Sequence, residues 1–371
     1  MHTIKFFPLG DAESFLITLD NGHRILFDYG NEHDPNDPDD LRIDLAEALR
    51  NELSATANDT IDVVAFTHLD RDHICKATEF FHLDHAKKYQ GNDRIKIKTL
   101  WVPAAVIIEE GCDEEQAIIR AEARHRLKNG YGIRVFSRPK KLEDWLNKQG
   151  LTLESRQDLI TDAGQLVPDY SQSLNGVEFF VHSPFASRLA DGTLVDRNTD
   201  ALAMQARFVD SGVETQFLIT SDLPWEALSA MVEVTQYHHN ERYLNWDIVD
   251  IPHHCSYLSL APDKGEDKTK PVDKIGWLYE KQAQRYGILI SSSRPIPSDD
   301  DDKQPPHRQA ANYYRDCAAK ISGEFRVTME HPRKDAPEPL VVTIDQYKAT
   351  IKKSQASAGT IITSRPAPRA G

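Results

Sequence analysis

Thr67-His68-Leu69-Asp70-Arg71-Asp72-His73 is the stretch that decides the expected fold, and it follows an apolar run over 61–66 that predicts a buried strand. Two histidines and two aspartates therefore come together where a strand ends. Alternate side chains of an extended segment point to the same side, so His68, Asp70 and Asp72 are expected to converge, with His73 flanking them. Imidazole with carboxylate suits zinc, manganese or iron. A solvated, charged turn is the alternative, but such turns rarely hold four donors in six positions. The metal ligands predicted here are His68, Asp70, Asp72 and His73.

This stretch resembles the HxHxDH signature of the metallo-β-lactamase fold, with Asp70 where the second histidine usually stands. The HxDxDH variant is similar to the hydrolase domain of the ComEC competence protein family and its soluble relatives. The resemblance implies an α/β fold, an αβ/βα sandwich of two mixed sheets with helices outside and the site at one sheet edge. It also implies a hydrolase with two divalent metal ions, Zn or Mn.

Further motifs occur in the order that this family shows. A strand over 24–29 ends in Leu-Phe-Asp-x-Gly, and the resemblance makes Asp28 a residue that orients the ligands. A strand over 177–182 ends at His182, which matches the third histidine ligand. The strand over 214–222 ends at Asp222, the counterpart of an aspartate that bridges two metals through its two oxygens.

The strand over 246–252 runs into a histidine pair followed by Cys255 and Ser256. Adjacent side chains diverge, so one histidine is expected to face the metals and the other the leaving group. The resemblance favours His254 as a metal ligand and His253 as the general acid. Asp72 is the other predicted catalytic residue. A Cys255 thiolate ligand is the alternative at the position where relatives have glycine.

Basic residues gather between 120 and 141, where eight stand against the single acid Glu122. Arg120, Arg124 and Lys128 share one face of a predicted helix and could follow a phosphate backbone. A solvated helix face paired to distant acids is the alternative. The resemblance adds Arg294 and His307 as predicted contacts to a substrate phosphate.

Composition limits the other possibilities. The 371 residues carry a net charge of -14, which disfavours indiscriminate binding to nucleic acid. Four cysteines lie far apart, so no disulfide framework is expected. No apolar run reaches the roughly 18 residues that would cross a bilayer. The first residues enter a strand pattern directly, without a signal-peptide layout. We expect a cytoplasmic protein with no membrane contact.

The resemblance covers roughly 1–75 and 175–345. We therefore expect one hydrolase domain over 1–350, with an insertion specific to this branch at about 78–175. A disordered tail is expected over 351–371, where Ala, Ser, Pro and Gly prevail.

The sequence predicts a metal-dependent phosphodiesterase or nuclease that acts on a nucleic acid or nucleotide. The resemblance adds a possible setting in bacterial defence or DNA processing, and an operon-encoded protein partner. One alternative is a small-molecule hydrolase acting on a cyclic nucleotide, phosphoester or thioester. Another is a catalytically weak subunit that binds a partner.

Overall fold

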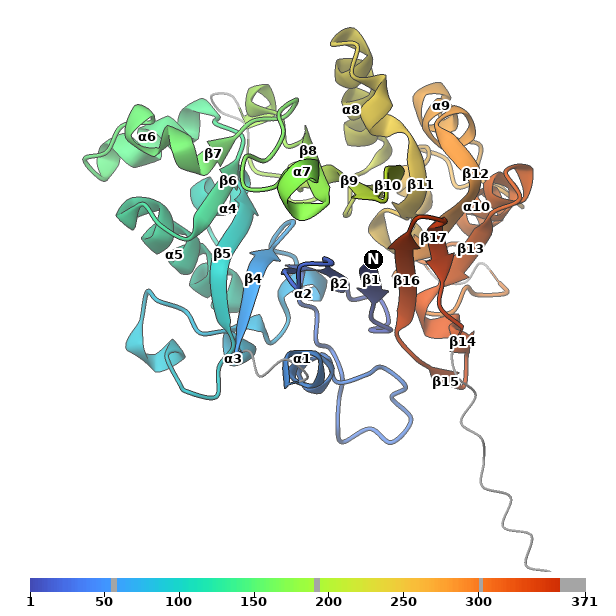
Figure 1. Ribbon diagram of the computed structural model, residues 1–371, viewed down its shortest axis with the longest axis horizontal. Coiled ribbons are helices and arrows are strands. Elements are labelled where there is room, and N and C mark those ends of the chain that lie inside the picture. Colours follow the sequence, from blue (N-terminus) through green and yellow to red (C-terminus); the bar gives the residue numbers. More distant parts are fainter. Residues whose placement is uncertain (55–58, 190–193, 300–302, 354–371) are drawn as a thin grey trace, which may run out of the picture.

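The computed structural model describes residues 1–54, 59–189, 194–299 and 303–353. Within them the chain forms two large mixed sheets and a short ribbon of β14 (Pro332–Arg333) and β15 (Ala336–Pro337). Figure 1 shows the strands gathered in the middle, with α5 and α6 on one side and α9 and α10 on the other. The helices are α1 (Leu45–Ser54), α2 (Arg71–Ile74), α3 (Ala77–Phe80), α4 (Ala104–Ile108), α5 (Glu114–Asn129), α6 (Lys140–Lys148), α7 (Gln172–Asn175), α8 (Trp225–Tyr237), α9 (Asp273–Lys281) and α10 (Arg308–Lys320).

The first sheet has nine strands in the described residues. Its antiparallel half includes β1, whose burial alternates as expected for a strand with one face in a core. From β3 to β7 the pairing is parallel. The strands in spatial order are β17 (Lys348–Ile351), β16 (Leu340–Asp345), β1 (His2–Phe6), β2 (Phe15–Thr18), β3 (Arg24–Phe27), β4 (Thr60–Ala65), β5 (Lys96–Pro103), β6 (Ile133–Phe136) and β7 (Ile160–Thr161).

The second sheet has six strands in the same described residues. Strands β10 to β13 pair in parallel, whereas β8 and β9 complete the sheet in antiparallel fashion. The strands in spatial order are β13 (Glu324–Val327), β12 (Ala283–Ser291), β11 (Trp246–Asp250), β10 (Val213–Ile219), β9 (Ala203–Asp210) and β8 (Val177–Ser183).

Three apolar cores hold the layers together. The middle core joins the inner faces of the two sheets, where Phe15 stacks on Phe27 and meets Phe217 edge-on. One outer core packs α1, α5 and α6 against the first sheet. The other packs α8, α9 and α10 against the second. Helix, sheet, sheet and helix therefore form the αβ/βα sandwich predicted from the sequence, and the fold class is confirmed.

Parallel pairing brings functional loops together, because parallel strands end at the same edge of a sheet. The loops after β3 and β4 leave the first sheet there, and those after β10, β11 and β12 leave the second. Hydrogen bonds join the two edges: Ser221 Oγ donates to Thr67 Oγ1 at 2.8 Å, and Leu202 N donates to Thr67 O at 3.0 Å.

The segment expected to be an insertion contributes β5, β6 and β7, which extend the first sheet by parallel pairing. Its status as a separate unit stays a prediction. The predicted tail lies outside the described residues from 354 onward. The elements that were not predicted include α9 and β17. No helix in the described part of the chain has the length and apolar character needed to cross a bilayer.

Candidate metal centre

The turn after β4 is less extended than the sequence suggested. The chain leaves β4 and enters α2 directly after Asp70, the residue that precedes the helix. Asp72 and His73 therefore project from a helical turn, and the expected alternation does not continue past Asp70. Convergence still results, because the helical turn folds the His73 ring back to 3.9 Å from the ring of His68, centre to centre.

Backbone hydrogen bonds fix this turn against the start of the chain. Glu13 N donates to Asp72 O at 3.0 Å, and Tyr29 N donates to His73 O at 2.8 Å. Gly30 lies so close that a Cβ there would stand 1.9 Å from Asp72 O. The glycine of Leu-Phe-Asp-x-Gly is thus required by a close approach of two backbones.

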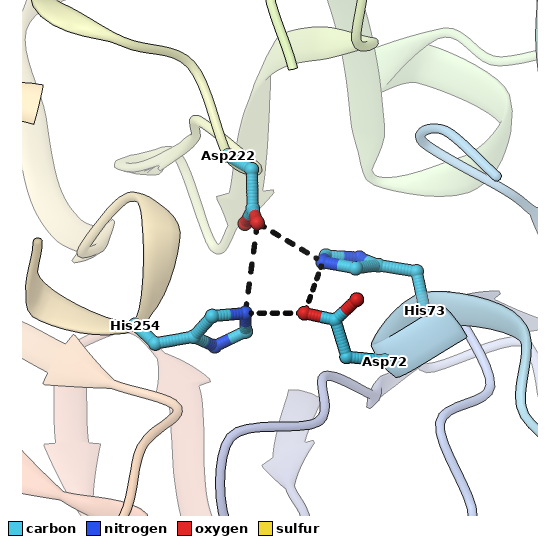
Figure 2. A group of neighbouring side chains, drawn as sticks. All are labelled: Asp72, His73, Asp222 and His254. Atoms are coloured by element: carbon cyan, nitrogen blue, oxygen red, sulfur yellow. Dashed lines mark hydrogen bonds and ion pairs between the residues drawn. The ribbon is translucent and has the colours of Figure 1, made fainter. Parts of the chain in front are cut away.

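Four of the predicted ligands meet in one group. Ligand atoms of Asp72, His73, Asp222 and His254 all lie within 4.8 Å of one another. Figure 2 shows the two histidine rings and the two carboxylates pointing toward a common centre. His254 Nε2 is 3.1 Å from Asp72 Oδ2, and His73 Nε2 is 3.4 Å from Asp222 Oδ2.

The histidine tautomers suit a metal. His73 Nδ1 donates to Asp28 Oδ2 at 2.8 Å, and His254 Nδ1 donates to the carbonyl of Ser292 at 2.8 Å. With Nδ1 donating outward, each Nε2 faces the site and can offer its lone pair to a metal ion. Such outer hydrogen bonds fix ring orientation at metal centres. Asp28 therefore occupies the orienting position that the resemblance implies.

A short relay sets the tautomer of His68 in the same way. Thr67 Oγ1 donates to Asp28 Oδ2 at 2.6 Å and receives the hydroxyl of Ser221. Its remaining neighbour, His68 Nδ1 at 3.1 Å, must then donate. His68 Nε2 is left buried, with no hydrogen-bond partner among the described residues, 3.7 Å from Asp70 Oδ2 and 3.9 Å from Asp222 Oδ2.

Electrostatics also favour a cation. Burial lowers the pKa of His73, but the charges of Asp222, Asp28 and Asp72 outweigh it and raise this pKa well above its ordinary value. Burial raises the pKa of Asp222, yet the neighbouring histidines hold it well below the usual range. The buried carboxylates thus attract positive charge, which a divalent ion would supply. Three imidazole nitrogens that face inward beside two carboxylates fit such an ion.

Asp70 has a different neighbour from the one expected. Its side chain is 38% exposed, and its Oδ1 accepts a hydrogen bond from Arg197 Nη1 at 2.8 Å. Arg197 was not predicted as a site residue. It belongs to a polar loop far along the chain, and nothing in the local sequence marks it.

His182 lies outside the metal group, which corrects the prediction that it is a ligand. Val177, Phe179 and Val181 fill the core between the sheets, so alternation turns His182 to the helix-covered face. Its Nε2 is 2.8 Å from Tyr243 O, and its Nδ1 is 3.4 Å from Thr235 Oγ1 in α8. Burial lowers the pKa of His182 to about 4, so the ring is a neutral core residue at neutral pH.

The two neighbouring histidines differ in exposure. His254 is buried in the group of four, whereas the side chain of His253 is 24% exposed, with Nε2 3.9 Å from Asp222 Oδ2. Both have φ of +51°, and Cys255 follows at +67°. Strained backbone of this kind gathers at functional sites. Cys255 is buried against the outer helices and is not part of the group of four, so the thiolate alternative is wrong.

Glu13 and Asp250 lie buried behind the site and were not predicted either. Burial raises the pKa of both carboxyls, and the charge of Glu13 raises that of Asp250 further. Glu13 precedes a strand and Asp250 ends one, so the sequence gives no sign that they meet.

Most of the predicted substrate-binding residues form hydrogen bonds or ion pairs with other groups of the protein. Arg120 Nη1 donates to Glu109 O at 2.6 Å and Arg124 Nε to Ile107 O at 2.7 Å, which fastens α5 to the end of α4. Lys128 is exposed. The guanidinium of Arg294 pairs with Asp11 at 2.5 Å. His307 is buried, with its Nδ1 3.4 Å from Tyr257 N.

Comparison with known proteins gives structural likenesses only. No protein-family model matches the chain, and no curated protein sequence matches it. Unliganded yeast PDE1 aligns over 88% of this chain and 97% of its own, with 11% identity and a TM-score of 0.43. A diphosphatase from the PhnP family aligns over 93% and 98%, with 12% identity and a TM-score of 0.32. The metallo-β-lactamase SMB-1 aligns over 66% and 78%, with 12% identity and a TM-score of 0.28.

Identities of this size bear on the fold alone, and TM-scores below 0.5 decide nothing by themselves. The fold assignment therefore rests on the layers and strand order described above. None of the three is described as a ComEC protein, so the narrower resemblance gains no support from them.

Proposed function

We propose that this chain is a metal-dependent hydrolase of phosphodiesters, acting as a phosphodiesterase or nuclease. One observation carries the proposal. His73 and His254 turn their Nε2 atoms toward the carboxylates of Asp72 and Asp222 at the edge where the two sheets meet. The group leaves His73 Nε2 and Asp222 Oδ1 buried without hydrogen-bond partners, and a bound ion would satisfy both atoms.

The donors fit zinc or manganese. Carboxylates make the site harder than an all-histidine site, which suits oxygen-rich phosphate substrates. When bound, a divalent ion supplies Lewis acidity and lowers the pKa of water toward neutrality. One ion would be held by the group of four. The second ion predicted from the sequence would use His68, Asp70 and a shared Asp222.

Two residues at the rim have roles in the proton transfers. His253 is partly exposed beside Asp222, so it is placed to give a proton to the departing oxygen as general acid. The side chain of Asp72 is 32% exposed and lies against His254, so it can also accept a hydrogen bond from the attacking water.

The test is an assay of purified protein on plasmid, single-stranded DNA, RNA and cyclic nucleotides with Mn²⁺ or Zn²⁺. Hydrolysis of at least one phosphodiester is expected, with loss on chelation and in Asp222→Asn. Asp59→Asn is the matched control, since Asp59 is an exposed aspartate paired with Lys96 on the surface. No hydrolysis of any phosphodiester, or equal activity in both variants, would contradict the proposal.

A small-molecule substrate is the second candidate, and the pairing of the basic residues favours it. Arg126 is paired with Glu122, Arg134 with Asp169. Ion pairs also engage Arg138 and Lys140. Much of the charge between 120 and 141 is thus already neutralised.

Salt dependence separates the two candidates. Each phosphate neutralised on duplex DNA contributes about -0.9 to the log–log slope of affinity against salt. A steep slope supports a polymer, and a flat slope with active hydrolysis of a cyclic nucleotide supports the small substrate. The setting in bacterial defence or DNA processing and the operon-encoded partner stay predictions from the sequence resemblance.

A further inference from the structure

Arg197 joins the metal centre to the helices outside the first sheet. Its Nη1 donates to Asp70 Oδ1 at 2.8 Å. Its Nε donates to Glu109 Oε1 at 2.8 Å and its Nη2 to Gln116 Oε1 at 2.9 Å. Glu109 follows the last residue of α4, and Gln116 lies in the first turn of α5.

Such anchoring makes the guanidinium a fixed part of the site. Three nitrogens of one planar group are engaged by three different side chains, and the Arg197 side chain is only 24% exposed. A guanidinium stays protonated in proteins, and here it donates hydrogen bonds to the carboxylates of Glu109 and Asp70. The positive charge is therefore permanent and held in place.

The two positions for metal ions are consequently unequal. The group of four offers a complete set of donors to one ion. A second ion would find His68, Asp70 and the shared Asp222, without His182, which faces α8 instead. One oxygen of Asp70 is already taken by Arg197, and a fixed cation beside this position repels another.

We propose that Arg197 decides how many metal ions the site holds. It occupies Asp70 and keeps the second position from filling, so the chain binds one ion tightly and the guanidinium supplies the second positive charge beside it. A guanidinium next to a metal ion suits the oxygens of a phosphate. This inference rests on the proposed function and specifies its metal content.

The experiment counts ions. After equilibration with Mn²⁺ at ten times the protein concentration and removal of free metal, the parent should retain about one ion per chain by elemental analysis. Arg197→Gln should retain about two, because Asp70 is released. Electron paramagnetic resonance gives an independent readout, with the signal of isolated Mn²⁺ in the parent and of a coupled pair in the variant. Arg138→Gln is the matched control, an arginine paired with Asp162 on the surface.

Two companion variants keep the outcome decisive. Arg197→Lys retains the charge and should bind one ion. Asp70→Asn should also bind one, since Asp70 is not among the four donors of the tight position. Two tightly held ions in the parent, an unchanged count in folded Arg197→Gln, or loss of all metal in Asp70→Asn would overturn the inference. Failure of the parent to take up any ion would instead defeat the proposed function.

Discussion

Replacing Gly30 by alanine tests whether the backbone around the metal turn is set by close contact. A Cβ at position 30 would stand 1.9 Å from Asp72 O and 2.7 Å from the Cβ of Ala12. Cβ atoms essentially never come closer than 3.0 Å to a neighbour, so the Asp72 carbonyl or the Gly30 backbone must move by at least 1.1 Å, the difference of the two distances.

The size of the effect follows from that displacement. Overpacking against a fixed backbone costs about 1–3 kcal/mol of the free energy of unfolding. Misplacement of a site residue by about 1 Å costs roughly 10²-fold in turnover. We expect Gly30→Ala to be less stable and to turn over more slowly by these amounts. It should also bind metal more weakly, because Asp72 and His73 share the displaced turn.

The assay is urea unfolding followed by tryptophan fluorescence, together with a metal titration. Gly276→Ala is the matched control: Gly276 lies within α9, and its nearest neighbour would be an ordinary 3.6 Å contact with Pro271. Alanine should stabilise that helix by about 0.5–1 kcal/mol. If Gly30→Ala proves as stable as Gly276→Ala and binds metal normally, the close approach does not set the turn.

Three more predictions concern the histidines and the carboxylate of Asp222. His254→Ala should lose metal, whereas His253→Ala should keep it and turn over roughly 10²–10⁴-fold more slowly; metal analysis showing the reverse would exchange their roles. Asp222→Asn should lose metal while its circular dichroism stays that of the parent, and unfolding instead would make the carboxylate structural. His182 has a lower pKa folded, about 4, than the ordinary 6.5, so its contribution to stability is present above pH 6.5 and lost as pH falls toward 4. Between pH 7.5 and 4.5 the parent should therefore lose up to about 3 kcal/mol more in urea unfolding than His182→Gln; equal losses would rule this out.

The sequence predicted those parts of the site that depend on the ends of strands. An apolar run followed by a carboxylate or imidazole places that group at a sheet edge, which is why the sequence could predict that His73, Asp222 and His254 lie together. The layered fold followed from the same motifs in order. These features are local, so a single sequence can reveal them.

The rest depends on geometry that no local pattern encodes. The prediction for His182 failed because the alternation along β8 turns its side chain toward α8, and the register with β9 shifts between Val181 and Ser183. Arg197 reaches Asp70 across 127 positions of sequence. The sequence suggested a phosphate-binding surface at 120–141, because acids that neutralise these basic residues, such as Asp169, lie elsewhere in the chain.

The distribution of the four donors over two sheets has a consequence for folding. Asp72 and His73 come from the loop after β4, whereas Asp222 and His254 follow strands of the other sheet. An ion bound there would link the two halves of the sandwich, so its binding free energy would stabilise the folded state against unfolding. At a free metal concentration of 1,000 times Kd, metal binding would add about 4.1 kcal/mol to the free energy of unfolding. The melting temperature would then depend on the metal concentration. Scarcity of metal would make the protein more susceptible to proteolysis, in addition to removing its activity.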